Sequence, residues 1–189
     1  MKLFLNHILQ VNHIRYTYSP RKMNFNRVKR QCHGGGLMVW GMLMPNGLIA
    51  AKILEGRQNS ENYIATIKEF CVPIMHLNIA PKIYLVQDNC SIHVSKRSTD
   101  FFKTQDFELI EWPSKSPDIN LMENIWKMMS DLIYSGRQPR NKEELKNKIF
   151  EAVYQINDEK RDVSMNLYST FRERLTKVLV RKGNSYNDL

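Results

Sequence analysis

The sequence predicts an α/β domain with a mixed β-sheet and helices on its faces. Short apolar runs typical of buried strands come before and between longer segments with helical spacing, and this order favours a helix-covered sheet. The 189 residues are enough for one domain with a hydrophobic core. A short strand and a basic loop are predicted within 12–33, strands at 37–44, 48–54, 82–87 and 107–112, and helices at about 61–76, 94–104, 118–134, 141–156 and 164–181.

The first two apolar strands are predicted to form a hairpin. LMVWGMLM (37–44) and LIAAKIL (48–54) flank Pro45-Asn46-Gly47, a sequence typical of a tight turn. KIYLVQ (82–87) is apolar enough to lie in the centre of a sheet.

Polar residues mark where two of the helices begin. Asn59 or Ser60 can cap the helix at 61–76, because their side chains accept hydrogen bonds from backbone N–H groups of the first turn. After the strand at 107–112 two prolines break the chain, and Asp118 or Asn120 then starts the next helix.

Positive charge is concentrated in the first part of the chain. The formal net charge is +9, and no acidic residue occurs between positions 15 and 30. A one-sided positive field attracts polyanions, and nucleic acid above all, although a solvated basic loop or a nuclear import signal has the same composition. The predicted nucleic-acid-binding residues are Arg15, Arg21, Lys22, Arg27, Lys29 and Arg30.

Other features exclude several classes of protein. No run of about 18 apolar residues is present, so no membrane span is expected. The three cysteines are scattered and odd in number, which favours free thiols over a disulfide framework. Cys90 and His93 have Cys-x-x-His spacing, but a zinc site needs two further ligands and none is evident.

Two carboxylates are candidates for one site. Asp88 follows the apolar strand at 82–87, at the strand end where α/β sheets place ligands, and Glu123 lies near the start of a predicted helix. Alone, Asp88 is more often a turn residue and Glu123 a solvated helix charge. Brought together, they would offer the oxygen ligands that Mg²⁺ or Mn²⁺ prefers, and such ions can activate water toward a phosphodiester.

Five segments together resemble the catalytic domain of Tc1/mariner transposases, which belong to the DDE superfamily of endonucleases and integrases. The two most specific are VQDNCSIH and WPSKSPDINLMENIW, with 34 residues between Asp88 and Glu123. The others are GGGLMVWGMLMPNGLI, EGRQNSENYIATI and VLVRKGNSYND.

The resemblance implies a ribonuclease-H-like fold and metal-dependent cleavage and strand transfer of DNA in the nucleus. Asp88 would be the second catalytic Asp and Glu123 the catalytic Glu, both binding Mg²⁺ or Mn²⁺. Asn89 and His93 would support the site. The expected partners are DNA and either a second copy of the chain or a full-length transposase in a mixed assembly.

One part of the family pattern is missing. The family has a further catalytic Asp at the end of its first strand, but no Asp precedes Asp88 in this chain, and Lys2, Asn6 and His7 cannot replace an anionic ligand. The chain is therefore expected to begin just past that position, with an incomplete first strand. We divide it into a basic strand and loop remnant (1–36) and a catalytic core with C-terminal helices (37–189).

The missing acid leads to two functional predictions. The first is a DDE endonuclease domain acting on DNA whose catalysis is impaired, because losing a central catalytic group costs on the order of 10³-fold or more in rate. The alternative is a non-catalytic nucleic-acid-binding protein, either a domesticated transposase or a regulatory remnant.

Overall fold

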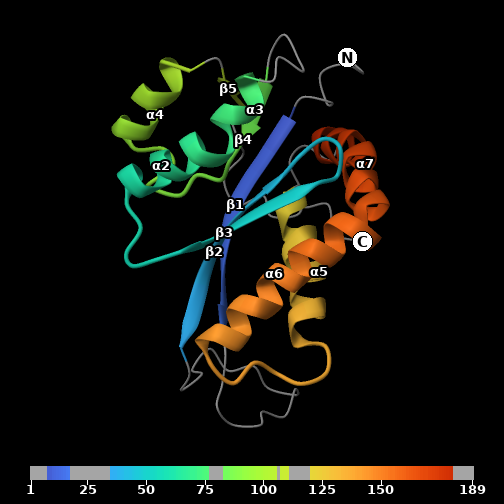
Figure 1. Ribbon diagram of the computed structural model, residues 1–189. Coiled ribbons are helices and arrows are strands. Elements are labelled where there is room, and N and C mark those ends of the chain that lie inside the picture. Colours follow the sequence, from blue (N-terminus) through green and yellow to red (C-terminus); the bar gives the residue numbers. More distant parts are fainter. Residues whose placement is uncertain (1–7, 18–34, 77–82, 106, 111–119, 181–189) are drawn as a thin grey trace.

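The computed structural model describes residues 8–17, 35–76, 83–105, 107–110 and 120–180. Its centre is a five-stranded mixed sheet with the strand order β3-β2-β1-β4-β5 (Figure 1). The antiparallel part joins β1, β2 and β3, and the parallel part joins β1, β4 and β5. The strands are β1 (Ile8–Thr17), β2 (Gly36–Leu43), β3 (Ile49–Leu54), β4 (Ile83–Val86) and β5 (Phe107–Leu109).

The first strand differs most from the prediction. β1 has ten residues and is the central strand, paired with β2 on one side and β4 on the other. The mixed sheet is confirmed. The expectation of an incomplete first strand concerns residues before Ile8, which lie outside the described residues, so it stays a prediction. Residues 8–17 fall in the segment predicted to precede the core, yet they share one sheet with the strands of 37–189. The pairing explains this, because β1 supplies backbone hydrogen bonds to both neighbouring strands.

The predicted hairpin is confirmed. β2 and β3 pair antiparallel from Met38 opposite Leu54 to Leu43 opposite Ile49. In the turn, the backbone N–H of Met44 donates to the carbonyl of Leu48 at 2.8 Å. Gly47 has φ of 80°, a left-handed conformation that favours glycine.

The helices follow the predicted order with one extra break. The helix expected over 61–76 is divided into α2 (Ser60–Phe70) and α3 (Val72–His76), because Pro73 has no N–H with which to continue the helical hydrogen bonds. Asn59 caps α2, accepting a hydrogen bond from the N–H of Asn62 at 2.9 Å. The remaining helices are α4 (Lys96–Lys103), α5 (Leu121–Tyr134), α6 (Lys142–Glu159) and α7 (Arg161–Val180).

Two hydrophobic clusters lie in the domain. In one, residues of β1, β2 and β3 pack with residues of α5, α6 and α7, and Trp126 is among its buried members. In the other, the sheet packs with residues of α2, α3 and α4 around Trp40. Figure 1 shows the first group of helices and the second on different sides of the strands. Trp40 and Trp126 are core residues as predicted, and Trp112 lies outside the described residues.

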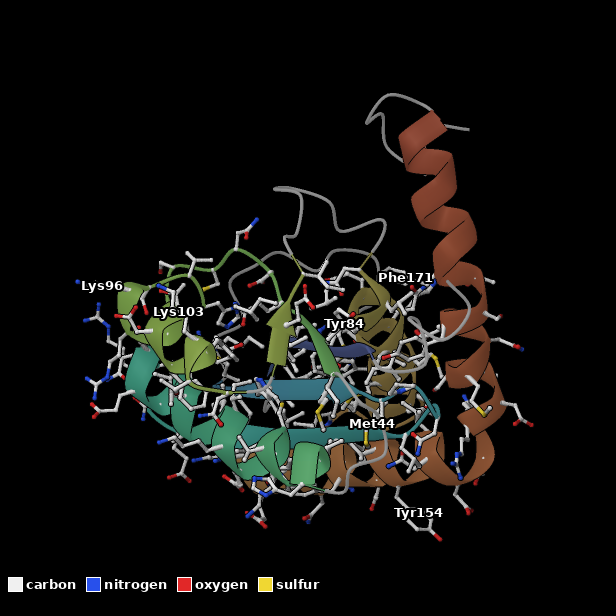
Figure 2. The ribbon with its side chains drawn as sticks, turned by 90° about the horizontal axis from the view of Figure 1, so that it is seen from above. Met44, Tyr84, Lys96, Lys103, Tyr154 and Phe171 are labelled. Carbon is white, nitrogen blue, oxygen red and sulfur yellow. The ribbon has the colours of Figure 1, made fainter. Side chains whose placement is uncertain are left out.

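Among the described side chains, the exposed large hydrophobic residues of the helices are Phe150 and Tyr154 on α6 and Val163 and Met165 on α7. Figure 2 shows Lys96 and Lys103 at the two ends of α4 and Tyr154 directed away from the body of the protein on α6. Within the described part of the chain, no helix combines the length and apolarity needed to cross a membrane.

Helix α5 is locked to the two central strands. The hydroxyl of Tyr16 on β1 donates to the carbonyl of Trp126 at 3.2 Å. Gly41 on β2 leaves the space that Trp126 fills, since a Cβ on Gly41 would lie only 2.3 Å from Cη2 of the indole. The position of α5, and of Glu123 in its first turn, is thus fixed by contacts with β1 and β2.

Candidate active site

Asp88 stands just beyond the end of β4, and its carboxylate is held by local contacts. The strand is buried at Ile83, Leu85 and Val86 and ends two residues before Asp88. Asp88 Oδ1 accepts a hydrogen bond from the backbone N–H of Cys90 at 3.0 Å and lies 2.7 Å from Nδ1 of His93. The turn interpretation of Asp88 is therefore correct, and the same bonds fix the carboxylate at the strand end.

His93 is a buried support for Asp88. The His93 side chain is 1% exposed, and its ring packs on that of Tyr63 with centroids 4.2 Å apart. The Tyr63 hydroxyl donates to Gln87 Oε1, and Gln87 Nε2 donates to the carbonyl of His93 at 3.4 Å. When Asp88 is ionised, Nδ1 of His93 must be the donor to it. A network from α2 thus orients the imidazole and, through it, the carboxylate.

Glu123 occupies the first turn of α5. The helix begins after Asn120, whose side chain accepts from the N–H of Met122 at 3.0 Å, while Leu121 and Met122 are buried. This selects Asn120 over Asp118 as the cap. Glu123 itself is exposed to solvent on one side.

The pKa of the Glu123 carboxyl is raised above its ordinary value. Partial burial is the larger cause and the negative charge of Asp88 is the second. A helix N-terminus favours the charged form of a carboxyl, so these two effects outweigh it here. The charge of Asp88 therefore reaches Glu123, which brings the two predicted catalytic residues into one electrostatic environment although 34 residues separate them.

This donor set suits a hard divalent cation. Two carboxylates that disfavour each other's charge are each stabilised by a cation placed between them, and their oxygens are the ligand type that Mg²⁺ and Mn²⁺ take. Asp88 and Glu123 are the residues that would hold such an ion.

Cys90 belongs to a second possible ligand group around Asp88. One ligand atom from each of Asp88, Cys90 and His93 lies within 4.8 Å of the others. Cys90 is a free thiol, as is Cys71. However, Nδ1 of His93 is at hydrogen-bonding distance from the Asp88 carboxylate. We therefore interpret this group as the hydrogen-bonded support of Asp88.

The other predicted site residues are placed as follows. Asn89 follows Asp88 directly and is exposed. Arg15 lies on β1 opposite Met38 and is also exposed. The remaining members of the predicted basic group lie outside the described residues, and their role in binding nucleic acid stays a prediction. They are Arg21, Lys22, Arg27, Lys29 and Arg30.

Comparison with known proteins places this chain in a family. A family profile described as "DDE superfamily endonuclease" matches residues 7–146, which is well over half of the chain. The chain belongs to the DDE superfamily endonucleases. The matched span runs from just before β1 into α6 and includes both Asp88 and Glu123.

The relatives of this DDE endonuclease domain are transposases of the Tc1/mariner type, which confirms the resemblance. The Tc3 transposase of Caenorhabditis elegans is 28% identical over 161 residues, covering 84% of this chain and 48% of the relative. The Tcb1 transposase of Caenorhabditis briggsae is 31% identical over 96 residues, covering 50% of this chain and 35% of the relative. The chain thus spans half or less of the length of these curated relatives.

Solved structures confirm the ribonuclease-H-like fold of the DDE endonuclease domain. The catalytic domain of Mos1 mariner transposase superposes with a TM-score of 0.77 at 14% identity, covering 97% of this chain and 86% of that one. A Mos1 paired-end complex with the left transposon end gives a TM-score of 0.79 at 14% identity, covering 97% of this chain and 57% of that one.

Sequence reasoning missed the support network behind Asp88. The sequence pattern indicates Tyr63 only as a helix-face residue and Gln87 only as the last residue of a strand. The available signal was Gln87 itself, because a polar side chain between a buried strand and a carboxylate needs a hydrogen-bond partner.

Proposed function

We propose that this chain is a DNA-acting transposase domain whose metal-dependent cleavage and strand-transfer chemistry is impaired. The observation that carries the proposal is geometric: Asp88 stands just past the end of β4 with its carboxylate held by Cys90 and His93, and Glu123 lies in the first turn of α5. Family membership supports it, since the family is one of endonucleases. A DNA substrate is consistent with the nuclear location predicted from the sequence.

The protein's own residues contribute positioning and charge. The Cys90 N–H and His93 hold Asp88 in one orientation, which lowers the entropy lost when the carboxylate binds an ion. Glu123 completes the pair from the first turn of a helix that is locked to the sheet. A divalent cation held by the two carboxylates supplies Lewis acidity toward a phosphodiester. Mos1 structures with Mg and with Mn support this choice of ion.

Impairment follows from the number of anionic ligands. The chain has no Asp before Asp88, so Asp88 and Glu123 lack the third acid that the family name denotes. With one anionic ligand fewer, cations are bound more weakly and phosphodiester cleavage is slower, by on the order of 10³-fold.

A non-catalytic nucleic-acid-binding role is the second candidate, and the net charge of +9 favours it. Such a protein, domesticated or regulatory, would bind DNA through salt-sensitive phosphate contacts and would act as a homodimer or within a mixed assembly with full-length transposase. The Mos1 paired-end complex, a structural neighbour that holds a left transposon end, supports DNA as the partner.

A Mn²⁺ titration separates the two candidates. Binding is followed by the loss of the free-ion electron paramagnetic resonance signal, and cleavage by incubation with a nicked DNA duplex. We expect weak Mn²⁺ binding that disappears in Asp88→Ala and slow cleavage that disappears with it. Asp131→Asn, which neutralises an exposed acid farther along α5, is the matched control and should bind like the native chain.

The outcomes are distinct. DNA binding without any effect of Mn²⁺ would favour the non-catalytic role. Failure of the folded protein to bind either Mn²⁺ or DNA would overturn both.

A further inference from the structure

Three residues of the loop after β4 form a compact group of metal-binding donors. Asp88, Cys90 and His93 each offer one ligand atom, and the three atoms all lie within 4.8 Å of one another. The sequence predicts no zinc site here, because the Cys90–His93 pair needs two further ligands and none is evident. The loop supplies one of them, the carboxylate of Asp88. A zinc ion with three protein ligands keeps its fourth position for water.

The backbone of the loop brings the three donors together. The Cys90 N–H donates to Asp88 Oδ1 at 3.0 Å, and the Cys90 carbonyl accepts from the N–H of His93 at 2.8 Å. The end of the loop is tied to α4, since the hydroxyl of Ser98 donates to the carbonyl of Ile92 at 2.6 Å. The loop thus has this shape before any ion binds, so little conformational entropy is lost on binding.

The group has a buried side and an open side. The His93 side chain is 1% exposed and its ring packs on that of Tyr63, which holds the imidazole in place. Asp88 and Cys90 are only partly buried, and 35% of the Asp88 side chain is exposed. An ion can therefore reach the donors from solvent, and a water molecule can occupy the fourth position.

Among the described contacts, the Cys90 thiol is not part of the hydrogen-bonded support of Asp88. Cys90 enters that support through its backbone N–H and carbonyl. A serine or an alanine would make the same bonds, so the support does not explain a thiol at this position. A thiol adds a soft ligand, which favours Zn²⁺ over Mg²⁺ and Mn²⁺.

Zinc geometry requires only small movements of the donors. Zinc bonds of about 2.0 to 2.3 Å place two ligands of a tetrahedral ion roughly 3.5 Å apart. His93 Nδ1 and Asp88 Oδ1, which are 2.7 Å apart, must separate slightly, and two donors at the 4.8 Å limit must approach by about 1 Å. In the protein without metal, the Nδ1 proton joins His93 to Asp88, and the ion takes the place of that proton.

We propose that Asp88, Cys90 and His93 bind one Zn²⁺, with water as the fourth ligand, and that this ion competes with Mg²⁺ or Mn²⁺ for Asp88. On binding, the Cys90 thiol releases its proton to solvent, and neutral His93 passes to the tautomer that carries its proton on Nε2. The competition rests on the proposed function, because it requires the Asp88–Glu123 pair to hold a divalent cation. One carboxylate thus belongs to two ligand sets, so that zinc inhibits the DNA-cleaving reaction.

Cobalt substitution tests the zinc site without relying on catalysis. Co²⁺ serves as the probe because a cobalt–thiolate bond absorbs light in the near ultraviolet, whereas Zn²⁺ has a filled d shell and gives no such signal. We expect the reduced protein to take up one Co²⁺ with a cobalt–thiolate band. Added Zn²⁺ should remove the band by displacing the cobalt, and this displacement measures the zinc affinity.

Matched variants identify the ligands. Cys90→Ser keeps the backbone contacts, but it should abolish the cobalt–thiolate band and weaken Zn²⁺ binding at least about tenfold, since removing even a residue that supports a ligand commonly costs this much. Asp88→Ala should also weaken Zn²⁺ binding. Cys71→Ala removes the other described thiol, which is buried, and should bind Zn²⁺ like the native chain. Circular dichroism checks folding, and Cys90→Ala replaces Cys90→Ser if the latter does not fold.

Mn²⁺ binding with and without zinc tests the competition. One equivalent of Zn²⁺ should weaken Mn²⁺ binding by the native chain, followed by the electron paramagnetic resonance signal of the free ion. The same amount of Zn²⁺ should have little effect on Mn²⁺ binding by Cys90→Ser. Glu123→Gln should keep the cobalt–thiolate band of the native chain, because Glu123 is not a member of the zinc-binding group.

The outcomes separate this inference from the proposed function. A cobalt–thiolate band that disappears in Cys90→Ser supports the zinc site. Its absence from the folded, reduced native chain, or its persistence in folded Cys90→Ser, overturns the zinc site even if Mn²⁺ binds through Asp88. If zinc binds as expected and leaves Mn²⁺ binding unchanged, the competition is wrong. If zinc binds and the native chain holds no Mn²⁺, the zinc site stands and the metal-dependent function fails.

Discussion

The packing beneath α5 and the site at the strand ends differ in how many residues each depends on. Beneath α5, a large set of apolar side chains from four strands and three helices forms one cluster, and Trp126 fits the space left by Gly41. At the strand ends, the proposed chemistry depends on two residues, Asp88 and Glu123. A change at either acid should therefore alter metal binding while the fold stays close to that of the Mos1 catalytic domain, with a TM-score of 0.77.

The largest loss of stability is expected from Gly41→Ala, because this change disturbs the packing beneath α5. The added Cβ would approach Cη2 of the buried Trp126 to 2.3 Å and Met122 Cε to 3.0 Å. Overpacking of this kind costs about 3 kcal/mol of unfolding free energy. Urea unfolding measures it. The displaced α5 should also carry Glu123 away from Asp88 and weaken Mn²⁺ binding.

A double-mutant cycle with Trp126→Phe identifies the cause. Among the residues that the structure describes, the indole Nε1 of Trp126 has no hydrogen-bond partner, so the change to Phe removes bulk without removing such a bond. The two substitutions should couple favourably by more than about 1 kcal/mol. Simple additivity would show that the contact between Gly41 and Trp126 does not decide the stability.

A medium effect is expected from Asn157→Ala, which tests how α6 is tied to the sheet. Asn157 Oδ1 accepts from the N–H of Ile49 at 2.8 Å, and its Nδ2 donates to the carbonyl of Ile49 at 2.9 Å. Ile49 opens the edge strand β3, so Asn157 satisfies backbone groups at the sheet edge. Losing both bonds should cost about 1 to 3 kcal/mol, measured by urea unfolding.

The control for this change is Asn147→Ala on the exposed face of the same helix. It should change stability by no more than about 0.5 kcal/mol. A similar loss in both variants would point to a general effect of substitution in α6.

The sequence was sufficient for the elements built on strong apolar patterns and insufficient for β1. The hairpin, β4 and the long helices have uninterrupted apolar spacing, and their order alone predicted the mixed sheet. β1 contains Gln10, Asn12, His13 and Arg15, polar residues that interrupt the apolar pattern of a strand. The central place of β1 became visible only through its pairing with β2 and β4, since register is a property of paired strands.

The sequence offered candidate site residues but not the contacts that support them. Asp88 and Glu123 were predicted from two motifs and their resemblance to a known family, and their catalytic roles stay predictions. The contacts of His93 with Tyr63 and of Tyr63 with Gln87 join α2 to the loop after β4, and such long-range contacts leave no local pattern.

The smallest expected effect is a gain in stability, and it comes from Glu123→Gln, which tests the site and not the packing beneath α5. Folding raises the pKa of Glu123, through burial first and the charge of Asp88 second, so the folded chain binds this proton more tightly than the unfolded chain. Stability from this group is then present below the ordinary Glu range and is lost as pH rises through the raised pKa. A glutamine has no proton to lose in this pH range, so Glu123→Gln does not lose this stability as pH rises.

At neutral pH the Glu123→Gln protein should therefore be more stable than the native chain. The gain should stay below about 1 kcal/mol, because solvent screens an exposed pair. The two should converge below about pH 4, where the carboxyl is protonated in both states. Melting temperatures across this range, with Asp131→Asn as the matched control for removing one acid from α5, measure the difference. If Glu123→Gln were instead less stable at neutral pH, the positive end of α5 would outweigh Asp88, and the two carboxylates would not form the repelling pair that a divalent cation relieves.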